Sequence, residues 1–211
     1  SWKELYARTI KLASALTKLG IKHGDTVSIL SANTPEMIEA HFGVPMSGAV
    51  LNTINTRLDA ETIGYILNHS EAKVFIVDSE LSPQAESAIE LSKNKDLYVI
   101  DIVDFQNARE PKTIGHITYD KFIGSGDADF DWQLPNDEWD AISLNYTSGT
   151  SGKPKGVVYH HRGSYLMSMG TITDWDLPKH PKYLYTVPLF HCNGWGHALS
   201  LIHISEPTRP R

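Results

Sequence analysis

Segments typical of strands and segments typical of helices alternate along the first half of the chain. Apolar residues recur at three- and four-residue steps from Trp2 to Leu19 and are followed by Gly20, which predicts an amphipathic helix. Thr26–Leu30 is typical of a buried strand, and the Asn33-Thr34-Pro35 run after it favours a helix start. Such alternation predicts an α/β fold in which helices flank a sheet.

The same pattern extends along most of the 211 residues, a length sufficient for one good-sized domain with a hydrophobic core. The other expected strands span residues 50–54, 73–77, 97–102, 141–145, 157–159 and 183–187, and the other expected helices span residues 35–47, 59–68, 82–92 and 164–173. Between residues 103 and 138 the periodicity fades, and the acidic, turn-rich run at 124–129 favours a surface connection.

A run rich in glycine, hydroxyl groups and lysine separates two of the expected strands. It reads Tyr-Thr-Ser-Gly-Thr-Ser-Gly-Lys-Pro-Lys-Gly-Val over residues 146–157. Glycine permits positive φ and a close approach of the backbone, so successive N–H groups can converge on anionic oxygens, while hydroxyls add donors and lysines add charge. Because ligands of open α/β sheets bind where strands end, we interpret the run as a phosphate-binding loop.

The spacing of this loop differs from that of the Walker phosphate loop. A Walker loop has four residues between its first glycine and the Gly-Lys pair, whereas Gly149 and Gly152 are two residues apart and Pro154 follows Lys153. Proline also biases Lys153 toward extended backbone, which disfavours a helix start directly after the loop. The alternative is an ordinary Ser/Gly-rich surface turn, but the fixed order of Lys, Pro and Gly between two strands favours phosphate binding.

The composition argues against several other classes of protein. Asp and Glu outnumber Lys and Arg by 25 to 19, so no basic surface for nucleic acid or anionic lipid is expected. The single Cys192 cannot form an intrachain disulfide, and no Cys/His spacing of the zinc type occurs, so no metal site is expected. No apolar run approaches the roughly 18 residues of a membrane span. We expect a cytoplasmic location, or an organellar one if a targeting segment precedes Ser1.

Two motifs resemble those of a known superfamily. Residues 147–156 resemble the signature loop of the adenylate-forming enzymes, which include acyl-CoA synthetases, luciferases and peptide-synthetase adenylation domains. Residues 188–196, Pro-Leu-Phe-His-Cys-Asn-Gly-Trp-Gly, resemble the acyl-pocket motif of the acyl-CoA synthetase branch. The opening Ser-Trp-Lys-Glu-Leu run and Gly24-Asp25-Thr26-Val27 are similar to the start of the same large domain. The resemblance implies that residues 1–198 are part of the N-terminal domain of an AMP-binding enzyme, with sheet layers flanked by helices and with both ends truncated.

The resemblance also implies a reaction. A carboxylic acid attacks the α-phosphate of ATP, which gives an acyl adenylate and pyrophosphate, and the thiol of coenzyme A then displaces AMP. We therefore expect ATP, Mg²⁺ and coenzyme A as cofactor and co-substrates, and a short- or medium-chain carboxylic acid as substrate. Two alternatives are a carrier-protein loading enzyme of another adenylating branch and a truncated, non-catalytic nucleotide-binding protein. The sequence does not indicate an oligomeric state.

Each motif supplies candidate site residues through this resemblance. The expected ATP- and phosphate-binding residues are Thr147, Ser148, Gly149, Thr150, Ser151, Gly152, Lys153, Pro154, Lys155 and Gly156. The expected acyl-pocket residues are His191, Asn193, Gly194 and Trp195, with His191 at the carboxylate end as a binding or gating residue. A packing histidine is the alternative for His191, and a helix start with a core aromatic is the alternative for the other three. Cys192 is expected to be a small buried side chain.

The last residues depart from the family pattern. Residues 199–211 resemble the conceptual translation of a transposase sequencing adaptor, so we expect a non-native tail; a divergent helix end followed by a Pro-rich tail is the alternative. The later acidic motif, the ribose-binding aspartate, the hinge and the small domain with the catalytic lysine do not occur in the 211 residues. We therefore assign no catalytic residue here and expect little or no ligase activity from this chain alone.

Overall fold

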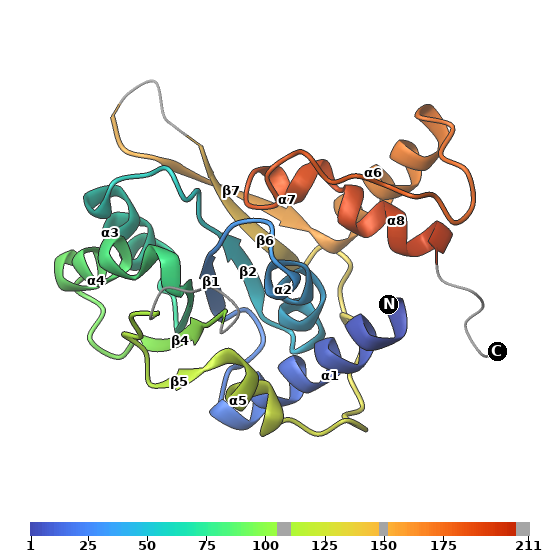
Figure 1. The fold of residues 1–211 in the computed structure, drawn as a ribbon. Coiled ribbons are helices and arrows are strands. Elements are labelled where there is room, and N and C mark those ends of the chain that lie inside the picture. Colours follow the sequence, from blue (N-terminus) through green and yellow to red (C-terminus); the bar gives the residue numbers. More distant parts are fainter. Residues whose placement is uncertain (105–110, 148–151, 206–211) are drawn as a thin grey trace.

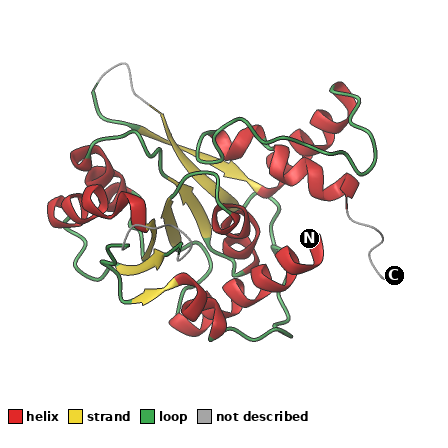
Figure 2. Ribbon diagram, in the orientation of Figure 1, coloured by secondary structure: helices red, strands yellow, loops and turns green. Residues whose placement is uncertain are grey.

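The computed structural model describes residues 1–104, 111–147 and 152–205, and these contain one seven-stranded sheet with helices on both faces (Figures 1 and 2). The strands are β1 (Thr26–Leu30), β2 (Val50–Thr53), β3 (Val74–Asp78), β4 (Tyr98–Ile102), β5 (Ile117–Thr118), β6 (Ala141–Thr147) and β7 (Lys155–His160). The helices are α1 (Trp2–Leu19), α2 (Pro35–Met46), α3 (Ala60–His69), α4 (Ser82–Leu91), α5 (Tyr119–Gly124), α6 (His161–Asp174), α7 (Cys192–Trp195) and α8 (His197–Ser205), with a 3₁₀ turn η1 (Ser79–Leu81).

The sheet has the order β5-β4-β3-β1-β2-β6-β7. Strands β1 to β6 run parallel to their neighbours, and β7 returns antiparallel to β6 as the second arm of a hairpin. Parallel neighbours require crossover connections, which α2, α3 and α4 provide. The predicted α/β fold, a sheet flanked by helices, is confirmed.

Strand side chains alternate between two cores. Val27 and Ile29 of β1 pack with α1 and α2 on one face, whereas Leu30 packs with α3 and α4 on the other. In β3, Ile76 joins the first core and Phe75 joins the second, as the two-residue period of a strand requires. Both faces of these parallel strands are therefore buried, which explains why they read as continuous apolar runs.

The helix ends follow the sequence signals. Thr34 caps α2 by accepting a hydrogen bond from the Met37 N–H, and Asp59 caps α3 by accepting one from the Thr62 N–H. Gly20 ends α1 in the left-handed conformation with φ 95°. The predicted helix boundaries are confirmed at these positions because the capping groups are local and do not depend on the rest of the fold.

Two expectations about the second half of the chain were wrong. The predicted surface connection at 103–138 contains β5 and α5, and α5 buries Phe122 and Ile123 against α1. The predicted strand at 183–187 is an irregular segment, and the Val187 carbonyl is bonded to the Asn33 side chain. Residues 183–187 are not among the seven strands found in the described part of the chain.

The end of the described chain is helical. Helix α8 includes residues 199–205, and Leu201 is buried where α8 contacts α6. Residues 206–211 lie outside the described residues. The origin of residues 199–211 stays a prediction. Among the described helices, none combines the length and the apolar character needed to cross a membrane.

Candidate functional site

Residues 188–196, called here the acyl segment, are fastened to the sheet by polar side chains. The Asn33 side-chain amide binds the backbone on both sides of Pro188, where the segment begins. Its Nδ2 donates to the Val187 carbonyl at 2.9 Å, and its Oδ1 accepts from the Leu189 N–H at 2.8 Å. The Thr53 hydroxyl, on β2, lies 3.0 Å from the Phe190 carbonyl oxygen. Leu189 itself is buried in the core between these two anchors.

Asn193 attaches the acyl segment to the sheet through a buried side chain. It has φ 50° and ψ 42°, a left-handed conformation that Asn tolerates better than most residues, and its side chain is buried. Its Oδ1 accepts hydrogen bonds from Ser143 Oγ at 2.9 Å and from Asn145 Nδ2 at 2.7 Å, both on β6. Its Nδ2 lies 3.3 Å from Nε2 of His41 on α2. Both ends of this buried amide therefore have partners.

The position of the proton on His41 follows from its second contact. His41 Nδ1 lies 2.7 Å from the Met37 carbonyl, which can only accept, so Nδ1 carries the proton and Nε2 is left to accept from Asn193. Burial lowers the pKa of His41 because desolvation disfavours the imidazolium, while the backbones of Met37 and Leu189 oppose this shift. His41 is therefore a neutral acceptor at neutral pH.

The other predicted acyl-pocket residues occupy the turn around Asn193. The His191 side chain is exposed, with its Nδ1 3.8 Å from Cys192 Sγ. Gly194 has φ 62°, and its carbonyl accepts from the Tyr185 hydroxyl at 2.7 Å. The side chain of Trp195 lies outside the described part of the structure. Cys192 is only partly buried, which differs from the expected small buried side chain, because the cysteine lies on a turn close to the surface.

The predicted phosphate loop connects β6 and β7. Thr147, the last residue of β6, pairs with Lys155, the first residue of β7, so the two strands on either side of the run form an antiparallel pair. Gly152 has φ 110°, and no helix follows Lys153, as the proline at 154 predicted. Ser148, Gly149, Thr150 and Ser151 lie outside the described residues. Phosphate binding by this loop stays a prediction.

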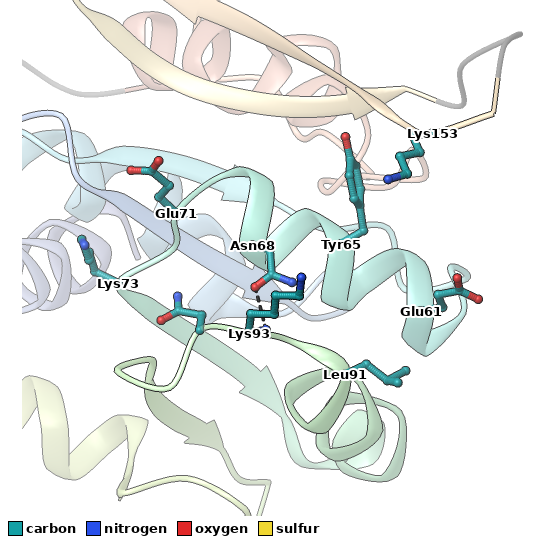
Figure 3. Close-up of a pocket in the computed structure, with 9 residues that line it drawn as sticks. Glu61, Tyr65, Asn68, Glu71, Lys73, Leu91, Lys93 and Lys153 are labelled. Carbon is teal, nitrogen blue, oxygen red and sulfur yellow. Dashed lines mark hydrogen bonds between the residues drawn. The ribbon is translucent and has the colours of Figure 1, made fainter.

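An open pocket of about 880 Å³ lies between the hairpin and helices α3 and α4 (Figure 3). The Lys153 ammonium is 5.3 Å from the centroid of the Tyr65 ring on α3, within the range of a cation–π interaction. Figure 3 shows these two side chains next to each other at the hairpin side of the pocket. The pocket is also lined by Glu61, Asn68, Glu71, Lys73, Leu91, Lys93 and Asn94.

Tyr146, just before the loop, has a hydroxyl oxygen that lies 2.7 Å from His69 Nδ1, within hydrogen-bond distance. Burial, with a smaller contribution from Tyr65, raises the pKa of Tyr146 to about 12. The tyrosine therefore keeps its proton at neutral pH and holds the end of β6 against α3. Within residues 1–104, 111–147 and 152–205, no three His, Cys, Asp or Glu side chains gather into a group that could hold a metal ion.

Sequence reasoning missed the residues that anchor the acyl segment. These are Asn33, His41, Thr53, Ser143 and Asn145. A signal was present in β6, where two polar residues spaced by two must face the same side of an otherwise apolar strand. No comparable signal marked His41, because a histidine in an apolar helix is usually a packing residue.

The fold and the two motifs place the chain in a protein class. The model of the AMP-binding enzyme family matches residues 1–205. The chain belongs to this family of AMP-binding enzymes.

Relatives and solved structures agree with that assignment. The chain is 44% identical over 215 residues to the acetate/butyrate–CoA ligase AAE7, peroxisomal, of Arabidopsis thaliana, with 97% of the chain and 38% of the relative covered. It is 43% identical to the 2-methylpropanoate–CoA ligase CCL4 of Humulus lupulus, with 93% of the chain and 36% of the relative covered. The chain thus spans little more than a third of the length of these relatives.

Solved structures show the same fold. The long-chain-fatty-acid–CoA ligase FadD1 from Archaeoglobus fulgidus superposes with a TM-score of 0.82 at 22% identity, over 97% of this chain and 38% of that chain. A Mycobacterium tuberculosis fatty acyl CoA synthetase gives a TM-score of 0.77 at 26% identity, over 95% of this chain and 37% of that chain.

Proposed function

We propose that the parent protein, meaning the longer protein that contains this chain, is an ATP-dependent acid–thiol ligase. It activates a short- or medium-chain carboxylic acid as an acyl adenylate and transfers the acyl group to coenzyme A. One observation carries the proposal: Asn193 of the acyl segment is hydrogen-bonded to Ser143 and Asn145 of β6, and β6 leads directly into the candidate phosphate loop. The acyl segment is thus attached to the strand that leads into the loop.

The first step requires no general base from this chain. The attacking carboxylate is ionised at neutral pH, and its oxygen forms a bond to the α-phosphorus as the bond to pyrophosphate breaks. Negative charge develops on the departing pyrophosphate. The backbone N–H groups of residues 147–153, 155 and 156, the hydroxyls of this run and the ammonium of Lys153 or Lys155 would stabilise that charge. Mg²⁺ would arrive on the nucleotide phosphates and neutralise them further.

The acyl segment would bind the other substrate. The exposed side chain of His191 suits a group that contacts or gates the carboxylate end of the acid. Asn193, Gly194 and Trp195 would form a wall of the acyl site. In the second step the coenzyme A thiolate attacks the acyl carbonyl carbon, and AMP leaves with the electrons of the broken C–O bond.

The names of the relatives support a short-chain acid. They include an acetate/butyrate–CoA ligase of Arabidopsis thaliana and an acetate–CoA ligase and a 2-methylpropanoate–CoA ligase of Humulus lupulus. The Arabidopsis thaliana ligase is named as peroxisomal, which supports an organellar location as one of the two expected.

Product analysis tests the proposal. The parent protein is incubated with ATP, Mg²⁺, coenzyme A and, in separate reactions, acetate, butyrate, 2-methylpropanoate and hexanoate, and the products are identified by mass spectrometry. We expect the acyl-CoA ester and AMP in equal amounts with at least one acid. Formation of ADP, or no acid-dependent consumption of ATP, would contradict the proposal. Acyl transfer to a phosphopantetheinyl carrier protein, with none to coenzyme A, would favour the carrier-loading alternative.

A further inference from the structure

We propose that Asn193 is a positioning residue that fixes the distance between His191, at the carboxylate end of the acyl site, and Thr147, where the phosphate loop begins. The inference rests on the proposed ligase function, and it concerns how Asn193 holds the acyl segment in place. Asn193 acts through His191, two residues before it, and through β6, to which its side chain is bound.

The geometry of β6 shows how one amide can set this distance. Ser143, Asn145 and Thr147 lie at alternate positions of the strand and so share one face. The first two donate to Oδ1 of Asn193, and the third is the residue where the loop begins. At a strand rise of about 3.3 Å per residue, the anchor at Asn145 lies about 7 Å from Thr147. The acyl segment is therefore attached to β6 two residues before Thr147, where the loop begins.

A second observation is that the surroundings require an amide at position 193. The Oδ1 side faces two donors, whereas the Nδ2 side faces His41 Nε2, which can only accept because Nδ1 donates to the Met37 carbonyl. An amide satisfies both sides. An aspartate at position 193 would keep the two hydrogen bonds from β6 but would turn a carboxylate oxygen toward the lone pair of His41. That contact becomes favourable only when the Asp–His pair takes up one proton.

The titratable groups around His41 come from β7 and from α2 itself. Tyr159 of β7 and His41 both line one small cavity. Burial raises the pKa of the Tyr159 hydroxyl, which is also hydrogen-bonded to Cys192. On α2, Glu39 is bonded to Arg8 and to the Tyr119 hydroxyl. Neither tyrosine is ionised near neutral pH, so the proton taken up by an Asp–His pair is the expected new titration in this part of the molecule.

A double-mutant cycle in the parent protein tests the inference. The variants are Asn193→Asp, His41→Gln and the combination of both, with Asn136→Asp as a control that adds the same charge at an exposed position. The rate measured is acid-dependent exchange of pyrophosphate into ATP from pH 6 to pH 8. Ser143→Ala, which removes one donor to Asn193 Oδ1, is a milder second test in case His41→Gln does not fold.

We expect Asn193→Asp to lower the exchange rate about 10- to 100-fold at pH 8, because a small misplacement of reacting groups has effects of this size. The KM for ATP should change little. The melting temperature at pH 8 should fall, because the variant buries a carboxylate beside His41, but the protein should remain folded at the assay temperature. The ratio to wild type should rise toward one as the pH falls. Adding His41→Gln should restore the rate at pH 8 and remove this pH dependence, because the glutamine amide can turn its N–H₂ toward Asp. Asn136→Asp should be close to wild type, and His41→Gln alone and Ser143→Ala should each show a smaller loss than Asn193→Asp.

Several results would overturn the inference. They are an Asn193→Asp variant equal to wild type at every pH, a loss that the folded double variant does not restore, and a loss explained by a lower folded fraction. If His41→Gln does not fold, a folded Ser143→Ala variant with an unchanged rate would overturn it as well.

If wild type shows no acid-dependent exchange, the proposed function fails. The inference is then judged by ¹⁵N-histidine spectra of wild type and of Asn193→Asp. A neutral His41 with its proton on Nδ1 and a raised His41 pKa in Asn193→Asp support it, and an unshifted titration overturns it.

Discussion

At the scale of single residues, Gly194 has the strictest requirement in the acyl segment. Its φ of 62° disfavours L-residues with a side chain, and a Cβ at this position would lie 2.0 Å from the Tyr185 hydroxyl oxygen. That hydroxyl is already committed, because it donates to the Gly194 carbonyl. The glycine therefore permits a close approach between the turn and Tyr185 that holds the turn in place.

We expect Gly194→Ala to lower the free energy of unfolding by about 1–3 kcal/mol, the usual cost of a strained backbone position. Urea unfolding followed by circular dichroism measures the change. Gly170→Ala is the matched control, because Gly170 lies inside α6 and has open space where an alanine methyl group would lie. Alanine there should stabilise the helix by about 0.5–1 kcal/mol. Equal effects of the two substitutions would contradict the tight contact at Gly194.

The buried His41 makes the free energy of unfolding depend on pH, and the direction of this dependence follows from the direction of its pKa shift. Burial lowers its pKa below the ordinary value of 6.5, so between that value and the folded-state pKa the unfolded chain binds a proton that the folded chain does not. The free energy of unfolding should therefore fall as the pH drops below about 6.5. Urea unfolding at pH 7.5, 6.5 and 5.5 measures this. A slope that is the same in His41→Gln would show that other groups cause it.

At the scale of elements, the parts that the sequence predicted are those with local signals. Helix α3 was predicted to begin at residue 59, and the structure shows a local reason: the Asp59 side chain accepts from the Thr62 N–H only three residues away. Helix α5 was missed because six residues give too few turns for an apolar period to be visible, and its helical state depends on packing against α1. The strand predicted at 183–187 did not form. An apolar run becomes a strand only if a neighbouring strand pairs with it, and a local sequence pattern does not show which strands are neighbours.

Substitution of Phe122 tests whether α5 is an integral element. Its side chain is 4% exposed in the core that α5 shares with α1, so Phe122→Ala should lower the free energy of unfolding by about 3–5 kcal/mol. Leu134→Ala is the control, because Leu134 is 73% exposed in the same region of the chain and its loss should change stability by less than about 0.5 kcal/mol. If both variants unfold at the same urea concentration, α5 does not contribute to the core.

At the scale of the whole molecule, the two motifs were predictable and the connection between them was not. Glycine spacing and the order of Lys and Pro identified the loop, and residues 188–196 were identified by their resemblance to the family. The anchors at Asn33, His41 and Thr53 come from three other parts of the chain, so only the folded arrangement brings them to the acyl segment. Sequence alone indicated the groups expected to meet the substrates, whereas the structure indicates what holds the acyl segment in position.

Isotope exchange in the parent protein tests the central claim most directly, because it measures adenylation without the thiol step. The protein is incubated with ATP, Mg²⁺ and labelled pyrophosphate, without coenzyme A, in the presence and absence of acetate or butyrate. We expect label to enter ATP only when the acid is present, since exchange requires reversible formation of the acyl adenylate. Exchange that is independent of the acid, or no exchange with any short- or medium-chain acid, would contradict it.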